Sequence, residues 1–424
     1  MTPSALDLSK VTHVVVGIGM ALLTDLDRLL PEGSVLVLDE AETVEARQGK
    51  ERVSRFACVA GLLEAPTQDE ANAERLLETV PRPEGIRAVL PALEYGVVAA
   101  AALAAGWGVP GAGTGAARAL RDKAVLRETA GAHGIDQPRW EILEGPEGID
   151  AFRSAFGGRC VVKPANRQAS LGVRLLDAGP EAPEVWADLT AADERTQRAR
   201  YALPPKYLVE QRLEGPEFSV EALVSDGAIV FANVTGKNVL HGDRPVELGH
   251  VVPAPLSPDL AEALVDATRR LMDATGFTAG MVHAEWILHG GRPHLVECAG
   301  RLPGDRIHHL INLSHSCDLT AEYLRVLEGR APTVQSGAPR AAAIRFLTAG
   351  PGTVSAVDGV DEARRVPGVD ECQVYVEPGA EVREVASSWD RLGHVVAVGA
   401  DAGEAASRAE DAASRIRFVL GTSA

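Results

Sequence analysis

Residues 281–301 read MVHAEWILHGGRPHLVECAGR, two apolar runs joined by a pair of glycines. This pattern predicts a β-hairpin that turns across HGGR. With the turn centred on the second glycine, Leu288 pairs with His294 and Glu285 faces Glu297. The hairpin therefore predicts two carboxylates directly opposite each other on one face of a sheet.

The two facing carboxylates need a positive partner, because like charges in opposite positions destabilise a sheet. A divalent cation would supply it, and Mg²⁺ suits the site because it binds a few carboxylate oxygens and keeps water and phosphate ligands. Two alternatives stay open: the register differs by one residue, or Arg301 and Arg306 neutralise the pair. Glu285 and Glu297 are thus candidate metal ligands.

The N-terminal residues predict an open α/β layer. From Val11 to about Pro110, runs such as THVVVGIG and SVLVLDE alternate with helical segments, which is typical of a parallel sheet covered on both faces. A dinucleotide site is an alternative, since Gly17 and Gly19 follow the first strand and Asp39 closes the second. The third glycine of that fingerprint is absent, so a tight strand-to-helix turn is the simpler interpretation.

The central residues predict a unit of helices and antiparallel strands. Thr114 is a candidate N-cap for one long helix over residues 116–132, which are rich in strong helix formers. Further on, alternating strands on either side of Asp226-Gly227 give a clear hairpin signal.

The residues from about Ala338 onward predict a third unit. It combines short strands with an amphipathic terminal helix over 402–420, whose apolar positions include Ala405, Ile416 and Val419. We therefore expect an α/β protein with an α+β central unit. The three expected domains are 1–113, 114–337 and 338–424.

Charge and cysteine content exclude several classes of protein. The 424 residues carry 42 Lys and Arg against 59 Asp and Glu, a formal net charge of −17 at pH 7, so general binding to nucleic acid or an anionic membrane is not expected. The five scattered cysteines never form a CxxC pair, which argues against a disulfide framework or a zinc site. No signal peptide and no apolar run of about 18 residues is visible, and we expect a cytoplasmic protein.

Positive charge is concentrated in one stretch of this acidic chain. Between Arg118 and Arg174 there are ten Lys/Arg and seven Asp/Glu residues, 10 − 7 = +3. Lys123 and Lys163 lie in this stretch and Lys237 follows a predicted strand. A lone lysine in such a place usually just reaches solvent. Their grouping instead predicts a site for a compact anion.

A second group of acidic residues borders the segment YLVEQRLEGPEFSVE. Glu210 and Glu217 lie where the chain leaves a predicted strand. Backbone groups there could reach an adenine edge, while the carboxylates accept from an amino group or from ribose hydroxyls. A solvated strand end with exposed glutamates is the alternative.

The order of these motifs resembles the ATP-grasp superfamily, ATP-dependent ligases that join a carboxylate to an amine. The motifs are RDK at Lys123, VVKP at Lys163, VEQRLEGPEFSVE from Val209, VTGK at Lys237, HAE at Glu285 and VECAGR from Val296. The resemblance covers nearly the whole chain, and the N-terminal layer is similar to the family's pre-ATP-grasp domain. The run VELGHVVPAPL, together with VECAGRLPGD, is most similar to the L-amino-acid ligase branch, which makes dipeptides.

The resemblance implies a role for each candidate residue. The residues implied at ATP are Lys123, Lys163, Gln168, Ser170, Gly172, Glu210, Gln211, Leu213, Glu217 and Lys237. Glu285 and Glu297 would hold Mg²⁺, for which Mn²⁺ could substitute. Glu247 and His250 match a pair that lines the amino-acid pocket, and Arg301 resembles the arginine that receives a substrate carboxylate or stabilises the tetrahedral intermediate. The implied catalytic residues are Arg301, Lys163 and His250.

Two departures from the family pattern bear on the function. Many members have Glu-x-Asn where this chain has Glu297-Cys298-Ala299, so a second metal ion would have one protein ligand fewer. The expected phosphate loop ANRQASLGV contains only Gly172, unlike the glycine run of biotin carboxylases. A biotin-carboxylase-like enzyme and a non-catalytic nucleotide-binding module are the alternatives to a ligase.

The expected reaction follows from this resemblance. ATP would phosphorylate a substrate carboxylate to an acyl phosphate, and an amine would then attack it, giving an amide, ADP and phosphate. We expect small amino-acid or peptide substrates, a homodimer, and a mobile lid formed by the 166–172 loop or by the hairpin over 237–250, because an acyl phosphate hydrolyses in water.

Overall fold

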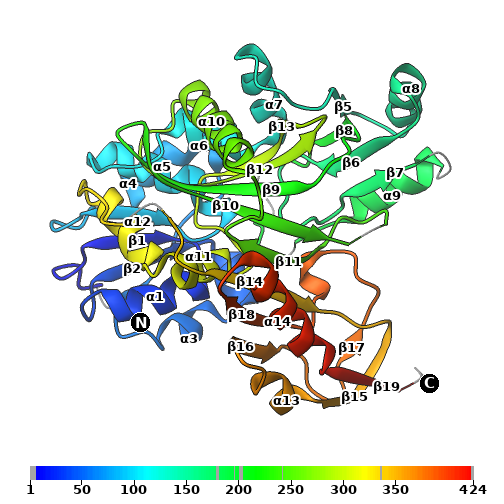
Figure 1. The fold of residues 1–424 in the computed structure, drawn as a ribbon. Helices are drawn as coiled ribbons and strands as arrows, with labels where there is room; N and C mark the ends of the chain where they lie inside the picture. The colour runs from blue at the N-terminus through cyan, green and yellow to red at the C-terminus, as the bar shows by residue number, and fades with distance from the viewer. Residues whose placement is uncertain are drawn as a thin grey trace.

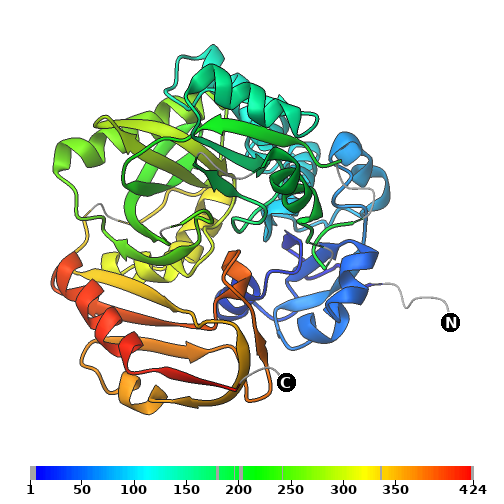
Figure 2. The same cartoon turned by 90° about the vertical axis from the view of Figure 1, so that its right-hand side faces the viewer.

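The structure, a computed structural model, describes residues 6–177, 181–194, 196–199, 204–240, 242–334 and 337–421. These residues form a parallel sheet near the N-terminus and three antiparallel sheets after it, which confirms the expected fold class. In Figures 1 and 2 the N-terminal layer (blue) and the C-terminal unit (orange to red) both lie below the central unit (green to yellow).

The N-terminal layer is a parallel sheet with helices on it, as predicted. Its strand order is β3-β2-β1-β4, formed by β1 (His13–Val16), β2 (Val35–Asp39), β3 (Val59–Glu64) and β4 (Ala88–Pro91). The helices are α1 (Met20–Leu29), α2 (Ala41–Ala46), α3 (Gly49–Val53), α4 (Leu76–Thr79) and α5 (Val97–Trp107), with 3₁₀ turns η1 (Glu70–Arg75) and η2 (Glu94–Gly96). Strands β1, β2 and β4 are buried throughout, which explains their unbroken apolar runs.

The turn after β1 argues against the dinucleotide interpretation. The Asp39 carboxylate is buried, and its two oxygens accept hydrogen bonds from the Ile18 and Glu40 backbone N–H groups, both at 2.8 Å. Both oxygens are therefore used to fix the strand-to-helix turn, and neither faces a ribose hydroxyl.

A small antiparallel sheet forms a separate lobe, called here the lid lobe (residues 140–211). Its strand order is β5-β8-β6-β7, formed by β5 (Trp140–Leu143), β6 (Cys160–Pro164), β7 (Arg174–Leu176) and β8 (Tyr207–Gln211). Helices α8 (Glu147–Phe156) and α9 (Ala182–Ala191) pack on this sheet around a core of their own, which includes Phe152, Val162 and Leu189.

The helix expected over residues 116–132 is in fact two helices, α6 (Thr114–Arg121) and α7 (Lys123–Ala132). Asp122 between them is extended, and its carboxylate accepts from the Ala124 N–H at 2.9 Å as the N-cap of α7. The same carboxylate accepts from Lys206 Nζ at 2.7 Å. The prediction of one helix was wrong because this cap, stabilised by a cation from the lid lobe, outweighs helix propensity. The break places Lys123 at the first position of α7.

The large antiparallel sheet carries most of the central unit. Its strand order is β13-β12-β9-β10-β11-β14-β18-β16. The strands are β9 (Glu217–Ser225), β10 (Ala228–Val239), β11 (Glu247–Val252), β12 (Gly280–His289), β13 (Arg292–Ala299), β14 (Ala341–Leu347), β16 (Val369–Val374) and β18 (Gly393–Gly399). The helices that follow are α10 (Pro258–Thr275), α11 (Ile307–His315) and α12 (Leu319–Leu327). No helix within the described ranges is long and apolar enough to cross a membrane.

The C-terminal residues combine helix and strand. The elements are β15 (Gly352–Asp358), α13 (Val360–Arg364), β17 (Glu381–Val382), the 3₁₀ turn η3 (Ser388–Asp390), α14 (Ala402–Ser414) and β19 (Arg417–Gly421). The expected terminal helix is therefore six residues too long: Ala405 is buried on α14, but Ile416 follows the helix and Val419 lies in β19. Pairing of β19 with β15 in a three-stranded sheet overrides the helical pattern at these positions.

The C-terminal unit is joined to the central unit by a continuous sheet. Strand β14 pairs with β11, placing Ile344 opposite His250. One hydrophobic core also includes Leu23 from the N-terminal layer, Met281 from β12 and Ile344. The division into three domains stays a prediction. The shared core shows that the three units pack against one another.

Candidate active site

A cavity of about 930 Å³ lies where the N-terminal layer, the lid lobe, the large sheet and the C-terminal unit meet. Its walls include Met20 from α1, Val161 from β6 and Trp389 from η3. The sequence-predicted residues that line it are Lys123, Lys163, Gln168, Ser170, Glu210, Gln211, Leu213, Glu217, Lys237, Glu247, His250, Glu285, Glu297 and Arg301. Gly172 is the predicted site residue that does not line the cavity.

Strands β12 and β13 place Glu285 opposite Glu297, as the sequence predicts. The turn is centred between the two glycines rather than on the second, so Leu288 pairs with Pro293 and not with His294. The predicted turn centre was therefore wrong, but the predicted pairing of the glutamates is correct, because a bulge in β13 shifts the register back.

The bulge lies one residue before Glu297. Trp286 pairs with Leu295, so Val296 is left out of the ladder and the register shifts between Glu285 and Trp286. The Val296 carbonyl accepts a hydrogen bond from Arg127 Nη2 at 2.7 Å. The bulge therefore places the two glutamates opposite each other. Its free carbonyl also connects the hairpin to α7.

Lysines rather than arginines contact the facing carboxylates. Glu285 Oε1 lies 2.9 Å from Lys237 Nζ and accepts from His283 Nε2 at 3.1 Å, and Glu297 Oε2 lies 2.8 Å from Lys123 Nζ. The proposed alternative, neutralisation by Arg301 and Arg306, is wrong. Those arginines pair with Glu94 and Glu371, respectively.

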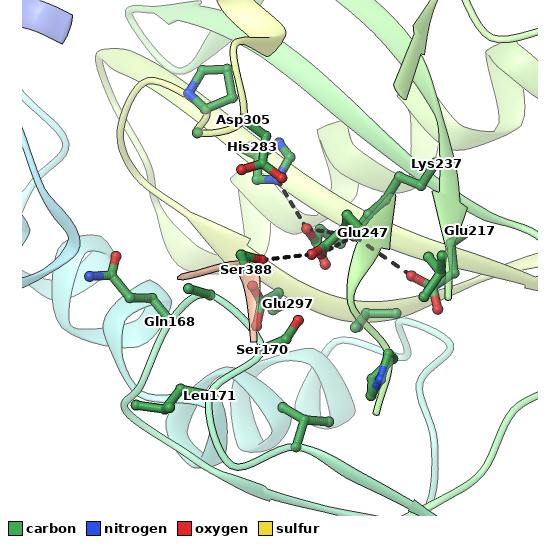
Figure 3. A pocket seen from close by; sticks show the side chains of 18 of the residues that line it. Gln168, Ser170, Leu171, Glu217, Lys237, Glu247, His283, Glu297, Asp305 and Ser388 are labelled. Carbon is green, nitrogen blue, oxygen red and sulfur yellow. Dashed lines mark hydrogen bonds and ion pairs between the residues drawn. The ribbon is translucent and has the colours of Figure 1, made fainter. Parts of the chain in front are cut away.

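Lys237 is surrounded by three carboxylates. Its Nζ lies 2.9 Å from Glu285, 3.3 Å from Glu247 and 3.6 Å from Glu217, and its side chain is 2% exposed. Burial alone would lower the pKa of this ammonium, but the three carboxylates raise it well above its ordinary value. Figure 3 shows Lys237, Glu217 and Glu247 gathered at one wall of the cavity. Lys237 is therefore a fixed charge that holds these acids together.

His283 and Glu221 extend this cluster, and the sequence analysis did not assign them a role. His283 Nδ1 lies 2.9 Å from Glu221, which is fully buried. Burial opposes protonation of His283, but its hydrogen bonds to Glu221 and Glu285 raise the pKa of His283 to about 9. The Glu221 carboxylate also accepts from Ser219 at 2.6 Å, Asn233 at 2.9 Å and Thr235 at 2.6 Å. This network fixes the orientation of Glu285.

The donor set fits Mg²⁺. Glu285 and Glu297 form an opposed pair, and both line the cavity. Around Lys237 and His283, the four carboxylates of Glu217, Glu221, Glu247 and Glu285 exceed the two cations, 4 − 2 = 2 negative charges. The described residues contain no group of three or more His, Cys, Asp or Glu arranged as a metal cage. Two carboxylates without a cage suit a metal that keeps water and phosphate ligands.

The strand that leads out of the lid lobe is held by a buried ionic cluster. Glu210 accepts from Arg127 Nε at 2.9 Å and lies 2.8 Å from Lys163 Nζ. Burial would raise the pKa of Glu210, but Arg127 and Lys163 lower it to about 2, while burial lowers the pKa of Lys163. The carboxylate of Glu210 is thus occupied by two cations. Gln211 and Leu213, just beyond it, line the cavity.

The expected phosphate loop connects β6 and β7 and has an unusual backbone. Ala169 and Ser170 both have positive φ angles, 58° and 56°. Such conformations cost about 1–3 kcal/mol each outside glycine and cluster at ligand sites. Gly172 has φ 73°, and a Cβ there would lie 2.9 Å from Cβ of Ala192. Gly172 therefore serves close packing within the lid lobe.

Ser388 of the C-terminal unit contacts Glu247 and the phosphate loop, and Arg301 contacts Glu94 of the N-terminal layer. Ser388 Oγ donates to Glu247 at 3.1 Å, and the Ser388 N–H donates to the Ala169 carbonyl of the phosphate loop at 3.2 Å (Figure 3). Arg301 Nε donates to Glu94 at 2.8 Å, and its Nη1 donates to the Leu302 carbonyl at 2.9 Å. Its Nη2 has no partner among the described residues.

Several residues of this site were missed by the sequence analysis. They are Glu94, Arg127, Glu221, His283, Asp305 and Arg391. His283 stands in the HAE motif, whose alternating pattern could have placed it on the same face as Glu285. The others act from distant elements and carry no local signal.

Comparison with known proteins identifies two regions of the chain. Residues 157–308 match the model of the ATP-grasp domain, and residues 345–421 match that of the L-amino acid ligase C-terminal domain 2. A crystal structure of an L-amino acid ligase from Bacillus licheniformis is similar, with a TM-score of 0.77, 17% identity and coverage of 97% of this chain and 99% of that one. Phosphoribosylglycinamide synthetase from Anaerococcus prevotii shares the fold with a TM-score of 0.68, 15% identity and coverage of 97% and 100%.

Sequence relatives point the same way over shorter stretches. D-alanine–D-alanine ligase of Pseudomonas entomophila is 26% identical over 179 residues, 40% of this chain and 51% of that protein. Alanine–anticapsin ligase of Bacillus subtilis is 23% identical over 213 residues, 46% and 44%. An uncharacterized protein of Sinorhizobium fredii is 29% identical over 280 residues, 65% and 56%. The chain thus spans about half the length of these relatives. Its residues 157–308 form a domain of the ATP-grasp family, and its residues 345–421 form a C-terminal domain of the L-amino acid ligase type.

Proposed function

We propose that this chain is an ATP-dependent carboxylate–amine ligase that joins amino acids or small peptides and releases ADP and phosphate. The observation that carries the proposal is one cavity that is lined by an opposed carboxylate pair, by Lys123 and Lys163, and by Arg301. Those are the groups needed to bind a polyphosphate, activate a carboxylate and stabilise an oxyanion.

The residues support a two-step reaction. A carboxylate is a poor electrophile, and transfer of the γ-phosphoryl group of ATP makes it an acyl phosphate with phosphate as leaving group. Such a transfer requires positioning and charge neutralisation more than covalent chemistry. Lys123 and Lys163 supply positive charge at one end of the cavity. Glu285 and Glu297 would hold Mg²⁺, which when bound neutralises phosphate charge; Mn²⁺ as a substitute is a further prediction.

The second step needs a stabilised tetrahedral oxyanion and two bound substrates. Arg301 Nη2 has no partner among the described residues, which leaves it free to receive a substrate carboxylate or the developing oxyanion. Holding the acyl group and the amine in one cavity supplies much of the entropic advantage of such a reaction. The loop of Ala169 and Ser170, which contacts Ser388 across the cavity, would exclude water.

Names of relatives support amino acids as substrates, since D-alanine–D-alanine ligase and alanine–anticapsin ligase are among them. A carboxylase is the second candidate, because biotin carboxylase structures share the fold. The sparse glycine content of the 166–172 loop disfavours it. A homodimer and a cytoplasmic location remain predictions; light scattering of the purified chain tests the first.

Phosphate release from ATP and Mg²⁺ tests the function directly. We expect release to be stimulated by a pool of L-amino acids and not by bicarbonate or buffer alone. Glu297→Ala should lower this rate by at least about 100-fold, because one of two metal ligands is lost. Stimulation by bicarbonate alone would favour the carboxylase. Absence of stimulation by any pool, or normal rates in Glu297→Ala, would contradict the proposal.

A further inference from the structure

His250 lies on β11 with one ring nitrogen engaged and the other free. The residue is 4% exposed and lines the cavity. Its Nε2 lies 3.1 Å from Asp305 Oδ2. A carboxylate only accepts hydrogen bonds, so Nε2 carries the hydrogen. Nδ1 is buried and has no partner among the described residues. A buried acceptor left unpaired costs about 1–3 kcal/mol, which points to a ligand group that is to meet it.

Asp305 is held firmly in place for this contact. Arg391 donates to both of its oxygens, Nη1 at 2.8 Å and Nη2 at 2.5 Å. The Arg391 guanidinium also lies 3.7 Å from the ring centroid of Phe346, which packs edge-on to His250. Burial opposes ionisation of Asp305, but the hydrogen bonds from Arg391 and His250 hold the pKa of Asp305 well below its ordinary value. Asp305 is therefore an anion behind the imidazole.

The backbone at Asp305 supports a functional role for this contact. Asp305 and Arg306 have φ angles of 53° and 61°, two successive left-handed residues that are not glycine. Each is anchored by the C-terminal unit, Asp305 by Arg391 and Arg306 by Glu371. Strain of this kind persists where surrounding contacts over-determine it, and it gathers at active sites and clamps.

We propose that His250 is the general base of the ligation step, and that Asp305 and Arg391 are positioning residues for it. The inference rests on the proposed function. The α-amino group of an amino acid is mostly protonated at pH 7, and the ammonium form cannot attack an acyl phosphate until it loses a proton. A histidine whose second nitrogen is bound to a carboxylate is suited to take that proton, because the carboxylate fixes the tautomer and stabilises the imidazolium.

The proton balance is complete without another reactant. Nδ1 takes one proton from the substrate ammonium, and Asp305 stabilises the resulting imidazolium. The neutral amine forms the C–N bond, and the bond from the carbonyl carbon to the phosphate oxygen breaks. The departing phosphate leaves with that electron pair and takes the second proton of the nitrogen. His250 returns its proton to solvent before the next turnover.

The charged groups around His250 do not offer a competing base. Lys237 lies opposite it on β10 and is engaged by three carboxylates. Glu247, on its own strand, is occupied by Lys237 and Ser388. On the other side β14 presents Ile344 opposite His250, and the charged Arg345 beside it donates to the Leu248 carbonyl.

Hydroxylamine separates the two steps of the reaction. It is a neutral nucleophile at pH 7, so it traps an acyl phosphate as a hydroxamate without a general base. We expect His250→Gln and Asp305→Asn to lower amide formation from L-amino acids by about 100-fold or more, while hydroxamate formation stays within about threefold of wild type. The deficit in amide formation should shrink at least tenfold between pH 7 and pH 9, where more of the amine is already neutral.

Two further variants distinguish positioning from folding. Arg391→Lys keeps a cation beside Asp305 and should retain more amide formation than Arg391→Ala, with an effect on kcat rather than on KM for ATP. Glu404→Gln, which removes an exposed ion pair with Arg408 on α14 away from the cavity, should leave both activities near wild type. Circular dichroism and thermal unfolding confirm that each variant is folded.

Three results would overturn the inference. Equal loss of hydroxamate and amide in the His250 variant would place His250 in acyl-phosphate formation, and undiminished amide formation would exclude it as the base. A deficit that stays constant from pH 7 to pH 9 would also exclude a proton-transfer role. If wild type forms no hydroxamate with any amino acid, the proposed function itself fails.

Discussion

Arg301 combines a structural and a chemical task at one residue. Its Nε donates to Glu94, which is 8% exposed, while Nη2 has no hydrogen-bond partner within the described part of the chain. Burial of Glu94 would raise its pKa, but Arg301 and Arg121 lower it. Because Arg121 remains in a variant without Arg301, the Glu94 carboxylate keeps one cation.

Arg301→Ala should therefore keep the fold and nucleotide binding but lose ligation. We expect the Kd for ADP with Mg²⁺ to change by less than about threefold, and kcat/KM for amide formation to fall by at least about 100-fold, the usual cost of removing an oxyanion donor. Calorimetric titration with ADP and an amide-formation assay measure the two quantities. Arg301→Lys, which keeps the charge, is the matched control. Full activity in Arg301→Ala would remove Arg301 from the mechanism.

His308, on α11, makes stability depend on pH. Its side chain is 11% exposed, and burial lowers the pKa of His308 to about 4 although Asp25 lies 3.9 Å away. In the unfolded chain the pKa of histidine is about 6.5. Between pH 6.5 and pH 4 the unfolded state binds a proton that the native state refuses, so the free energy of unfolding falls as the pH falls through this window.

We predict that His308 alone lowers the free energy of unfolding by about 2 kcal/mol between pH 7.5 and pH 5. Urea unfolding at a series of pH values measures this slope. His308→Asn should flatten it, whatever the absolute stability of the variant. An unchanged slope in His308→Asn would show that other groups dominate the pH dependence.

Residues in local motifs could be predicted from the sequence, and residues that act across elements could not. Glu285 and Glu297 were found because a hairpin places them at fixed spacing. Asp305 and Arg391 are 86 residues apart, and their contact depends on how the C-terminal unit packs. Long-range packing of this kind leaves no periodic trace in either segment.

At the scale of elements, Arg127 ties three segments together. From α7 it holds Glu210 at the end of β8 and donates to the Val296 carbonyl in the β13 bulge. Its side chain is fully buried. The bulge frees that carbonyl from the ladder, so its hydrogen bond has to come from elsewhere.

Arg127→Met should lower the free energy of unfolding by about 3–5 kcal/mol, the usual cost of leaving a buried charge without one of its partners. Urea unfolding measures the loss. In a double-mutant cycle with Glu210→Gln, the combined loss should be smaller than the sum of the single losses, because Gln no longer needs the charge of Arg127. Strict additivity would contradict this coupling between α7 and β8.

Element boundaries show where local signals compete. The break at Asp122 carries a recognisable cap residue, yet the helix formers on either side predicted one helix. At Ile416 the helical pattern continued, but pairing with β15 turned the chain into β19. The parallel N-terminal layer was predicted correctly because its strands are buried on both faces and read as continuous apolar runs. Strand partners and caps, by contrast, depend on tertiary contacts.

At the scale of the whole molecule, the hydrophobic cores divide the chain unevenly. One core joins Leu23, Met281 and Ile344 from the N-terminal, central and C-terminal units. The lid lobe instead has its own core, and it meets the rest through a small apolar cluster, Ala165, Leu208 and Trp140 with Ala124 of α7, and through polar contacts. The polar contacts include Gln197 and Ala199 with Gln68, Tyr95 with Glu194, Arg127 with Glu210, and Ser388 with Ala169.

This division predicts that the lid lobe opens before the rest of the molecule unfolds. Regions with their own small core and few apolar contacts outside it form low-stability cooperative units. In native-state hydrogen exchange, amides of β6 and β8 should exchange through an opening of lower free energy than amides of β1, β9 and β14. The latter three should share one high value, because a common core joins their units.

Hydrogen exchange with and without nucleotide tests whether the lid lobe opens on its own. ADP with Mg²⁺ at about 100 times its Kd should raise the opening free energy of the lid lobe by about 2.7 kcal/mol, since a ligand held between lobe and sheet binds only the closed form. The opening free energy measured at the amides of β14 should rise by no more than that of the lid lobe. If β6 and β1 instead exchange with one free energy in the absence of nucleotide, the lobe is not a separate unit. Its core would then be coupled to the rest through contacts such as that of Tyr95 with Glu194, which Tyr95→Phe should weaken.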